Sequence, residues 1–402
     1  MMSNQRIRAI TLAATMAFTT ILAGPPAHAE IGFEVGPLTV GGAMRVNYVQ
    51  GDYDRPGDGS LGRGSDEGNF ELDTFRINLG LSHEGIIGAA EYRWYDGYSF
   101  LHTGYLGYED EALGRVKVGV HRAPFGVGPF GPANSWFFDQ HYYVGLADQM
   151  KVGLKYTRAV GDFTFDLAYY LMDVPRGRGI SSDSVRYSYA VVPEDADGIP
   201  GAYEEEHQVN ARAVYSFDVG DVATDLGLSA KWSRLDAQDD RAANSDAYAL
   251  AVHSSSTYGP FNLMLQLTSY RYDADYRVDD PEVTDDLIVM GAFGFPWPVA
   301  SEGLIPSIAL SYTLTPDTDL VDSITFYNDY SVIIKNGERD GEDFNDSHLN
   351  VTGMAIAKGG WYILLDYAWS NGNYFVGPDG DFGANANDDW NYRFNINFGY
   401  YF

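Results

Sequence analysis

Basic side chains recur at inward-parity positions of short apolar runs along the 402-residue chain. Side chains alternate between the two faces of a β-strand, so residues of one parity share a face. The cations of this set are Arg45, Arg76, Arg93, Lys117, Lys151, Lys155, Arg212, Lys231 and Arg393. The carboxylates of the same parity that we identify are Glu91, Asp166, Asp329 and Asp366. A wet wall rich in cations predicts selection among dissolved ions rather than covalent catalysis.

The strands that must position these charges are clearest at the C-terminus. Six large apolar residues occupy alternate positions there, namely Tyr392, Phe394, Ile396, Phe398, Tyr400 and Phe402. Arg393, Asn395, Asn397 and Gly399 fill the gaps. A strand with lipid on one side and water on the other requires this division. The final Phe402 resembles the terminal aromatic residue of Gram-negative outer-membrane barrels, which the barrel-assembly machinery recognises.

Comparable two-faced runs follow one another from Leu38 to the end of the chain, joined alternately by tight turns and by long acidic loops. This predicts an all-β, transmembrane, antiparallel up-and-down β-barrel with short periplasmic turns and long extracellular loops. We count 17 runs, including Leu287–Phe295. Bacterial barrels have an even number of strands, so we predict 16 strands, with 18 as the alternative. We place the surplus run between Pro296 and Asn345, where prolines blur the boundaries.

The first 29 residues predict export. Arg6 and Arg8 precede an apolar run from Ala9 to Ala23, and Ala27-His28-Ala29 forms a cleavage site before Glu30. This is the pattern of a signal peptide. Residues 1–29 are therefore expected to be removed, leaving residues 30–402 as one barrel in the cell outer membrane, reached through the periplasm.

Composition narrows the functional classes. Removing Arg6 and Arg8 leaves 24 of the 26 basic residues against 56 acidic ones, an unsuitable balance for a nucleic-acid partner. The chain has no cysteine, so neither disulfides nor thiol chemistry are available. Its histidines are dispersed without a nucleophile signature, and we predict no enzyme activity, no metal site and no cofactor.

The segment from Arg122 to Gln149 interrupts the strand pattern. It contains three prolines and three glycines in its first half, which prevent regular strand pairing, and then a run of aromatic residues. Long structured loops are often functional. We predict a constriction loop folded into the lumen, with Arg122, Phe125, Asp139 and Asp148 as its candidate site residues. The alternative is an ordinary extracellular loop that packs on a neighbouring subunit.

Closure of the barrel would make the last strand a neighbour of the first. The candidate pore-lining residues are Arg45, Arg76, Arg93, Glu91, Lys117, Lys155 and Arg393. Clustered cations require water or counter-charges. Glu91, Asp139 and Asp148 could supply these counter-charges and create a field across the pore. Alternatively, the arginines brace the loop through salt bridges and select nothing.

The run VKVGVHRAPFG at 116–126, the aromatic loop and Gly153-Leu154-Lys155-Tyr156 together resemble the phosphate-selective porins of Gram-negative bacteria. Asp322–Ser331 and Gly353–Gly359 are similar to segments of related porin-like proteins. The resemblance implies a 16-stranded homotrimer with an infolded third loop. It also implies arginines that lead along the pore toward lysines at the constriction.

The predicted function is therefore passive diffusion of small hydrophilic solutes and inorganic ions, with a weak anion or phosphate preference. Expected partners are outer-membrane lipid and lipopolysaccharide, the barrel-assembly machinery through Phe402, and two further copies of the chain. Two alternatives stay open. One is a structural or adhesive barrel with a plugged lumen, and the other is a cation-preferring general porin.

Overall fold

The computed structural model describes residues 33–53, 64, 68–280, 282–378, 382–383 and 389–402. The expected signal peptide, residues 1–29, lies outside this part of the chain. Among the described residues, no helix has the length and apolar character needed to cross a membrane.

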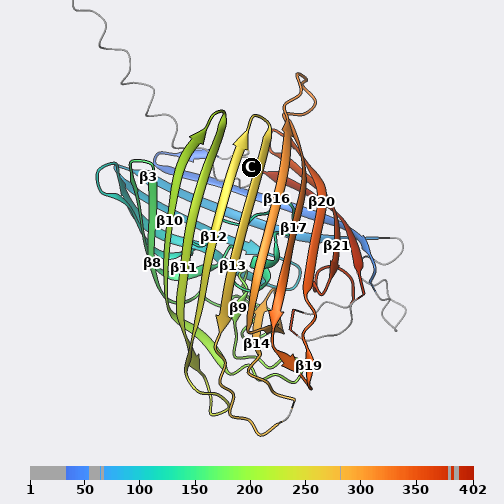
Figure 1. Cartoon of the computed structure of the whole chain (residues 1–402). Helices are drawn as coiled ribbons and strands as arrows, with labels where there is room; N and C mark the ends of the chain where they lie inside the picture. The colour runs from blue at the N-terminus through green and yellow to red at the C-terminus, as the bar shows by residue number, and fades with distance from the viewer. Residues whose placement is uncertain (1–32, 54–63, 65–67, 281, 379–381, 384–388) are drawn as a thin grey trace, which may run out of the picture.

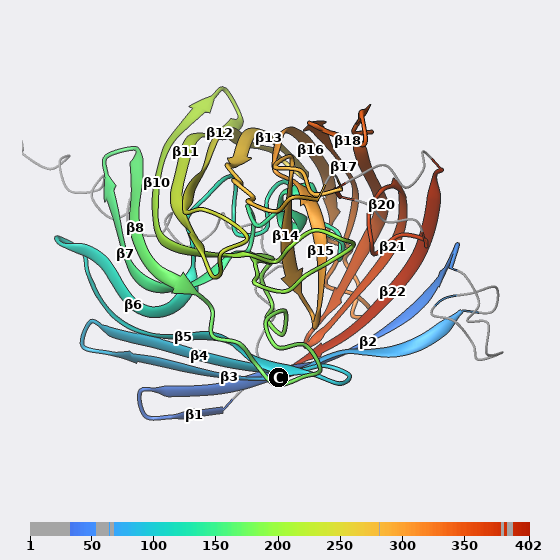
Figure 2. The same cartoon turned by 90° about the horizontal axis from the view of Figure 1, so that it is seen from below.

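The chain forms a closed antiparallel barrel of 16 strands (Figures 1 and 2). Each barrel strand pairs with the next, and β22 pairs with β2 to close the sheet. The barrel strands are β2 (Leu38–Gly51), β3 (Asn69–His83), β4 (Ile86–Trp94), β5 (Ser99–Asp110), β6 (Gly114–Arg122), β7 (Met150–Val160), β8 (Phe163–Asp173), β10 (Tyr203–Val219), β11 (Val222–Ala237), β12 (Ser245–Tyr258), β13 (Phe261–Tyr272), β16 (Glu302–Leu314), β17 (Ser323–Asn336), β20 (Ser347–Lys358), β21 (Trp361–Asn371) and β22 (Asn391–Tyr401). The predicted fold class and strand count are confirmed.

The remaining elements are short: β1 (Phe33–Val35), α1 (Gln140–Tyr143), β9 (Ala190–Val191), β14 (Leu287–Ala292), β15 (Phe295–Ala300), β18 (Glu338–Arg339) and β19 (Glu342–Asp343). In Figure 1 the tight connections lie at the upper end of the barrel and the long ones at the lower end. We call these ends the turn rim and the loop rim.

The period of two determines which side chains face outward. In β22, Asn395 and Asn397 are buried inside the barrel, whereas Phe398 is exposed on its outer face. On β11 the same alternation exposes Leu226 and Leu228 on the outer face and buries Ser229 on the inner face. An apolar outer surface of this kind is typical of a barrel surrounded by lipid.

One predicted barrel strand was wrong. The run Leu287–Phe295 is not part of the barrel: β14 pairs with β15 and β9 in a separate three-stranded sheet. Every residue of β14 is buried, because the sheet has protein on both faces. Its unbroken apolar sequence, LIVMGA, indicates such burial rather than a strand between lipid and water. The surplus run therefore begins before Pro296, outside the interval in which we placed it.

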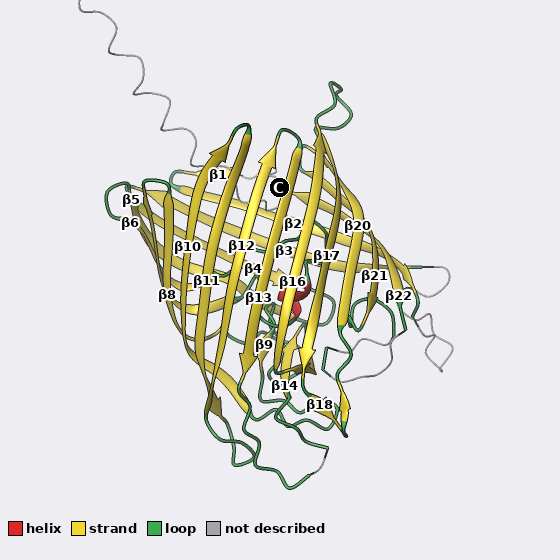
Figure 3. Ribbon diagram, in the orientation of Figure 1, coloured by secondary structure: helices red, strands yellow, loops and turns green. Residues whose placement is uncertain are grey.

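The long connections at the loop rim share one hydrophobic cluster inside the barrel. It joins Phe137 of the 123–149 loop, Tyr189 of the 174–202 connection and Trp297 of β15 to the inward-facing Ile305 and Val351 of the wall. Figure 3 shows α1 within the outline of the barrel, partway between its two rims. The interior at the loop rim is therefore packed with side chains.

The seam of the barrel depends on a glycine. Gly42 exchanges backbone hydrogen bonds of 2.7 and 3.0 Å with Phe402. A Cβ atom at position 42 would lie 2.4 Å from the carbonyl oxygen of Arg76 and 2.7 Å from the Phe402 ring. The backbone of β3 and the last residue of the chain thus leave no space for a side chain.

We expect Gly42→Ala to lower the stability of the barrel by about 1–3 kcal/mol, the usual cost of overpacking. The measurement is the temperature at which the folded barrel converts to the unfolded form in SDS. Gly104→Ala is the matched control, because its new methyl group would meet only the flexible side chain of Leu101, at 3.3 Å or more. Equal stability of the two variants would contradict this account of the seam.

Candidate functional site: the barrel lumen

The loop between β6 and β7 extends across the barrel interior to the opposite wall. Asp329 of β17 accepts hydrogen bonds from the backbone N–H groups of Asn134 (2.7 Å) and Ser135 (2.8 Å), and from the Asn134 side chain (2.8 Å). Asp366 of β21 accepts one from the backbone N–H of Trp136 at 3.2 Å. Two buried carboxylates of the wall therefore hold the middle of the loop.

Further hydrogen bonds attach the 123–149 loop to the wall on either side of residues 134–136. Ser229 and Gln266 accept from the backbone N–H groups of Gly126 and Val127, at 3.0 and 2.8 Å. The Gln140 backbone N–H, at the start of α1, donates to Ser331 at 3.0 Å. These partners lie on β11, β13 and β17, so the loop rests on the wall opposite its own strands.

Asp139 belongs to a buried polar cluster. Its Oδ2 lies 2.5 Å from Nδ1 of His141 and accepts a hydrogen bond of 2.9 Å from Ser307. Nε2 of His141 lies 2.7 Å from the hydroxyl of Thr268. The carboxylate therefore attaches the loop to β16 directly and to β13 through His141, and it is buried rather than facing a water-filled passage as we expected.

Asp148 is also used within the protein. Arg122 donates to its Oδ1 at 2.5 Å, and Tyr187 donates to its Oδ2 at 2.6 Å. Burial, with the neighbouring Asp148 carboxylate, raises the pKa of Tyr187, so that its hydroxyl remains a donor. Phe125 is buried in the same part of the interior. Of the four candidate loop residues, only Arg122 keeps a substantially exposed side chain, 32%.

Four of the nine inward cations are buried toward the loop rim with partners. Arg93 pairs with Glu91 and lies over the Tyr187 ring at 4.4 Å. Arg393 lies 3.6 Å from Glu71 and over the Trp136 ring at 4.7 Å. The other two share one carboxylate: Glu205 lies 2.6 Å from Lys151 and 2.7 Å from Lys231. These ion pairs and ring contacts hold the four cations inside the protein.

Three arginines nearer the turn rim are paired but reach water. Arg45 contacts Asp73 at 2.8 Å, Arg76 contacts Glu91 at 3.5 Å, and Arg212 contacts Asp166 at 3.2 Å. Their side chains are 21%, 18% and 20% exposed, respectively. Since they face the interior, this exposure indicates space for water inside the barrel along these strands. Each arginine has a carboxylate partner, and Arg76 shares Glu91 with Arg93.

Lys117 and Lys155 differ from the other inward cations. They are register partners on β6 and β7, directly opposite each other on the lumenal face, and both are half-buried. Nζ of Lys117 lies 4.1 Å from the centre of the Tyr105 ring, and Nζ of Lys155 donates to the Arg122 carbonyl at 2.8 Å. Within the described chain, no carboxylate lies within 4.0 Å of either ammonium. Like charges in this position repel each other, and an anion between them would relieve the repulsion.

Sequence reasoning missed several inward carboxylates, among them Glu71, Asp73, Asp173 and Glu205. Each lies at or beyond a β-bulge, where one extra residue reverses which parity faces inward. Asp73 is itself the extra residue opposite Arg45 and Val46. The wall is therefore much closer to charge balance than the count of nine cations against four carboxylates implied.

No protein-family model matches the chain, and no curated protein matches its sequence. Solved structures do match the fold. OmpT of Vibrio cholerae is 15% identical with a TM-score of 0.55, covering 92% of this chain and 100% of that one. DcaP of Acinetobacter baumannii is 12% identical with a TM-score of 0.55, covering 92% of this chain and 99% of its own. The anion-selective porin from Comamonas acidovorans is 12% identical with a TM-score of 0.51, covering 91% and 99%. The barrel fold is thus shared over nearly the whole of each chain.

Proposed function

We propose that this protein is an outer-membrane porin through which small hydrophilic solutes and inorganic ions diffuse passively. One observation carries the proposal: inward-facing charged side chains reach water beside a loop that crosses the barrel interior. Arg45, Arg76 and Arg212 would line the wet side of the passage, and the 123–149 loop would narrow it. Movement down a gradient through such a passage requires no cofactor and no reaction.

A weak preference for anions follows from the charges that remain unbalanced. Arg45 and Arg212 each face a carboxylate, whereas Lys117 and Lys155 add a formal charge of +2 at adjacent positions of the lumenal face. Arg122, near the Lys155 ammonium, is balanced by Asp148. The proposal extends to small anions in general. A phosphate-specific form has less support, because Arg122 is the only lysine or arginine in the 122–149 segment.

The solved structures with a similar fold support the proposal of an outer-membrane channel that prefers anions. One of them is described as an anion-selective porin and another as an outer-membrane channel. A further one, OmpT of Vibrio cholerae, is described in a trimer form. We extend the proposal accordingly to a homotrimer in the outer membrane, exported with the help of residues 1–29 and assembled through its C-terminal Phe402.

The test is the conductance of purified, refolded protein in planar lipid bilayers, together with the swelling of protein-containing vesicles in sugars of increasing size. We expect discrete current steps, and swelling that slows as the sugar becomes larger. A detergent-refolded barrel that inserts but produces neither current nor swelling would contradict the proposal.

A plugged barrel is the second candidate. The buried cluster of Phe137, Tyr189 and Trp297 favours it, because this cluster fills the interior at the loop rim with apolar side chains. A structural or adhesive role would then fall to the external loops. This candidate predicts no conductance from the wild type and conductance only after part of the internal packing is removed.

A further inference from the structure

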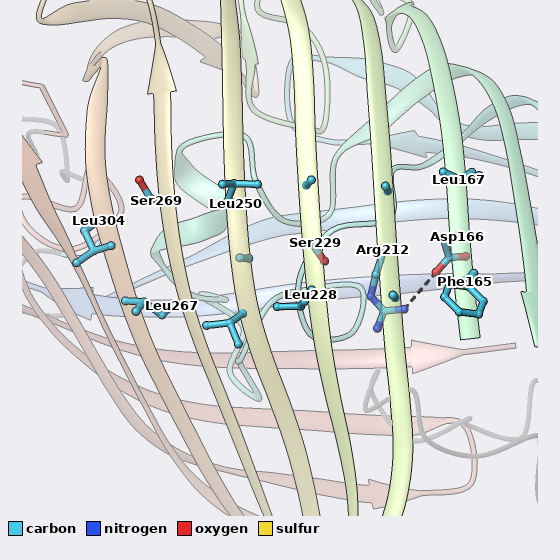
Figure 4. Close-up of a pocket in the computed structure, with 15 residues that line it drawn as sticks. Phe165, Asp166, Leu167, Arg212, Leu228, Ser229, Leu250, Leu267, Ser269 and Leu304 are labelled. Carbon is cyan, nitrogen blue, oxygen red and sulfur yellow. Dashed lines mark hydrogen bonds and ion pairs between the residues drawn. The ribbon is translucent and has the colours of Figure 1, made fainter. Parts of the chain in front are cut away.

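The outer face of the barrel contains an apolar hollow of about 780 Å³ on the wall formed by β8, β10, β11, β12, β13 and β16 (Figure 4). Its floor consists of small outward-facing residues, Ala211, Ala213, Ala230 and Ser269. Its sides consist of leucines, among them Leu228 and Leu250, which are 64% and 62% exposed. We call this feature the outer trough.

The strand register shows how the residues that line the trough are arranged across the six strands. Leu167, Ala211, Ala230, Leu250, Ser269 and Leu304 are successive register partners across the six strands. The adjacent row consists of Phe165, Ala213, Leu228, Val252 and Leu267. Ala211, Ala213 and Ala230 are adjacent in these two rows, and Leu250 separates them from Ser269.

Larger side chains border the trough on both sides. The row toward the loop rim contains Tyr169, Val209, Trp232, Tyr248, Arg271 and Glu302, again as successive partners. On the other side, Phe163 packs against Tyr215 with a ring-centre distance of 4.7 Å. The trough is therefore walled by aromatic rings and lined by hydrocarbon.

The two ends of the trough differ in polarity. Leu304 lies beside Arg271 and Glu302, which are half-exposed and form an ion pair at 3.2 Å. At the opposite end, Phe165 stacks on Phe163. Charged side chains suit the headgroup region of a membrane and phenylalanine rings, which have no polar group, suit its hydrocarbon, so a lipid would enter with its headgroup at the Arg271 end.

The length of the trough fits one leaflet. Six strands have five spacings of about 4.8 Å, which gives about 24 Å. Strands in such barrels tilt by about 40°, so a path at right angles to them rises by about 15 Å across the membrane. That is half of the hydrocarbon thickness of about 30 Å.

From this geometry we propose that the outer trough binds an acyl chain of a membrane lipid as an ordered ligand, with the lipid in the leaflet on the loop-rim side. The proposal rests on the proposed outer-membrane location. It concerns the outer face of the barrel and does not depend on conduction through the lumen.

The test compares the wild type with Ala211→Leu/Ala230→Leu, which fills the floor of the trough. Ala90→Leu is the matched control, because Ala90 is a small outward-facing residue of β4, paired with Leu79 and Gly104 away from the trough. Each protein is reconstituted in vesicles of dimyristoylphosphatidylglycerol, extracted into mild detergent and weighed by native mass spectrometry.

We expect the wild type and Ala90→Leu to retain the phospholipid. Retention by the filled variant should fall about tenfold, because filling the trough removes on the order of ten carbon–carbon contacts with the chain. A wild type without bound lipid, or equal retention by all three proteins, would overturn the proposal. If filling the trough instead dissociates an oligomer and leaves lipid retention unchanged, the occupant is a second copy of the chain and the proposal is also overturned.

Conductance separates this inference from the proposed function. Unit conductance of Ala211→Leu/Ala230→Leu should equal that of the wild type, because both alanines face away from the lumen. A non-conducting wild type that still retains lipid would refute the proposed function and support the trough. A conducting wild type that retains no lipid would support the proposed function and refute the lipid site in the trough.

Discussion

Replacing Lys117 and Lys155 with glutamate is expected to reverse the anion preference that we propose, so that the channel prefers cations. The substitution changes the local formal charge from +2 to −2 at two register partners on the wet wall. In water, a unit charge and an ion about 4 Å apart have an interaction energy of about 1 kcal/mol. In 0.1 M salt this interaction is screened over a distance of about 10 Å. Four units of charge should therefore change the chloride-to-potassium permeability ratio on the order of tenfold.

The measurement is the reversal potential of single channels in a potassium chloride gradient. Arg45→Gln/Asp73→Asn is the control, because it removes an ion pair from the same lumen without changing its net charge. We expect the control to keep the selectivity of the wild type. If the control shifts the reversal potential as much as the lysine variant does, the selectivity does not arise from the unbalanced lysines.

Releasing the 123–149 loop from the opposite wall is expected to widen the passage. In Asp329→Ala/Asp366→Ala the backbone N–H groups of Asn134, Ser135 and Trp136 lose their acceptors. Each buried donor without a partner costs about 1–3 kcal/mol, so the middle of the loop should leave its present position. We expect the unit conductance to rise about twofold or more, with greater current noise and passage of larger sugars.

Asp225→Ala is the matched control for this variant. Its carboxylate also lies on the wall, where it accepts a hydrogen bond of 2.6 Å from Ser216 near the turn rim. The control should conduct as the wild type does. If the double variant folds and shows unchanged conductance and sugar cut-off, the loop does not form the constriction.

Strand periodicity was sufficient to predict the fold. The alternation seen in β22 depends only on lipid outside and a polar interior, and it recurs in each barrel strand. On regular stretches the same alternation predicts that Lys117 and Lys155 share a face, and they are register partners on β6 and β7. Closure between β22 and β2 followed from the requirement that no strand edge remain unpaired in a membrane.

Irregular backbone limited what the sequence could reveal about the lumen. A bulge adds one residue and reverses the parity, so Asp73 and Glu205 were absent from the inward set although they form ion pairs with Arg45, Lys151 and Lys231. No local pattern identifies such a bulge in advance. The balance of charge on the wall therefore required the register itself.

Contacts between segments that are distant along the chain could not be predicted from the sequence either. The composition of the 122–149 segment predicted a structured loop, but the wall partners of His141 and Asp139, Thr268 on β13 and Ser307 on β16, lie more than a hundred residues away. The apolar pattern of β14, in contrast, could have predicted where this strand lies. Its continuous apolar run indicates a strand buried on both faces, and counting it among the two-faced strands produced the surplus.

The most direct test of the central claim is the zero-current potential of the wild-type channel between unequal potassium chloride solutions in a planar bilayer. We expect discrete channels and a potential whose sign shows that chloride crosses more readily than potassium. Channels that favour potassium, or inserted barrels that carry no current, would contradict a water-filled lumen whose unbalanced charge comes from Lys117 and Lys155.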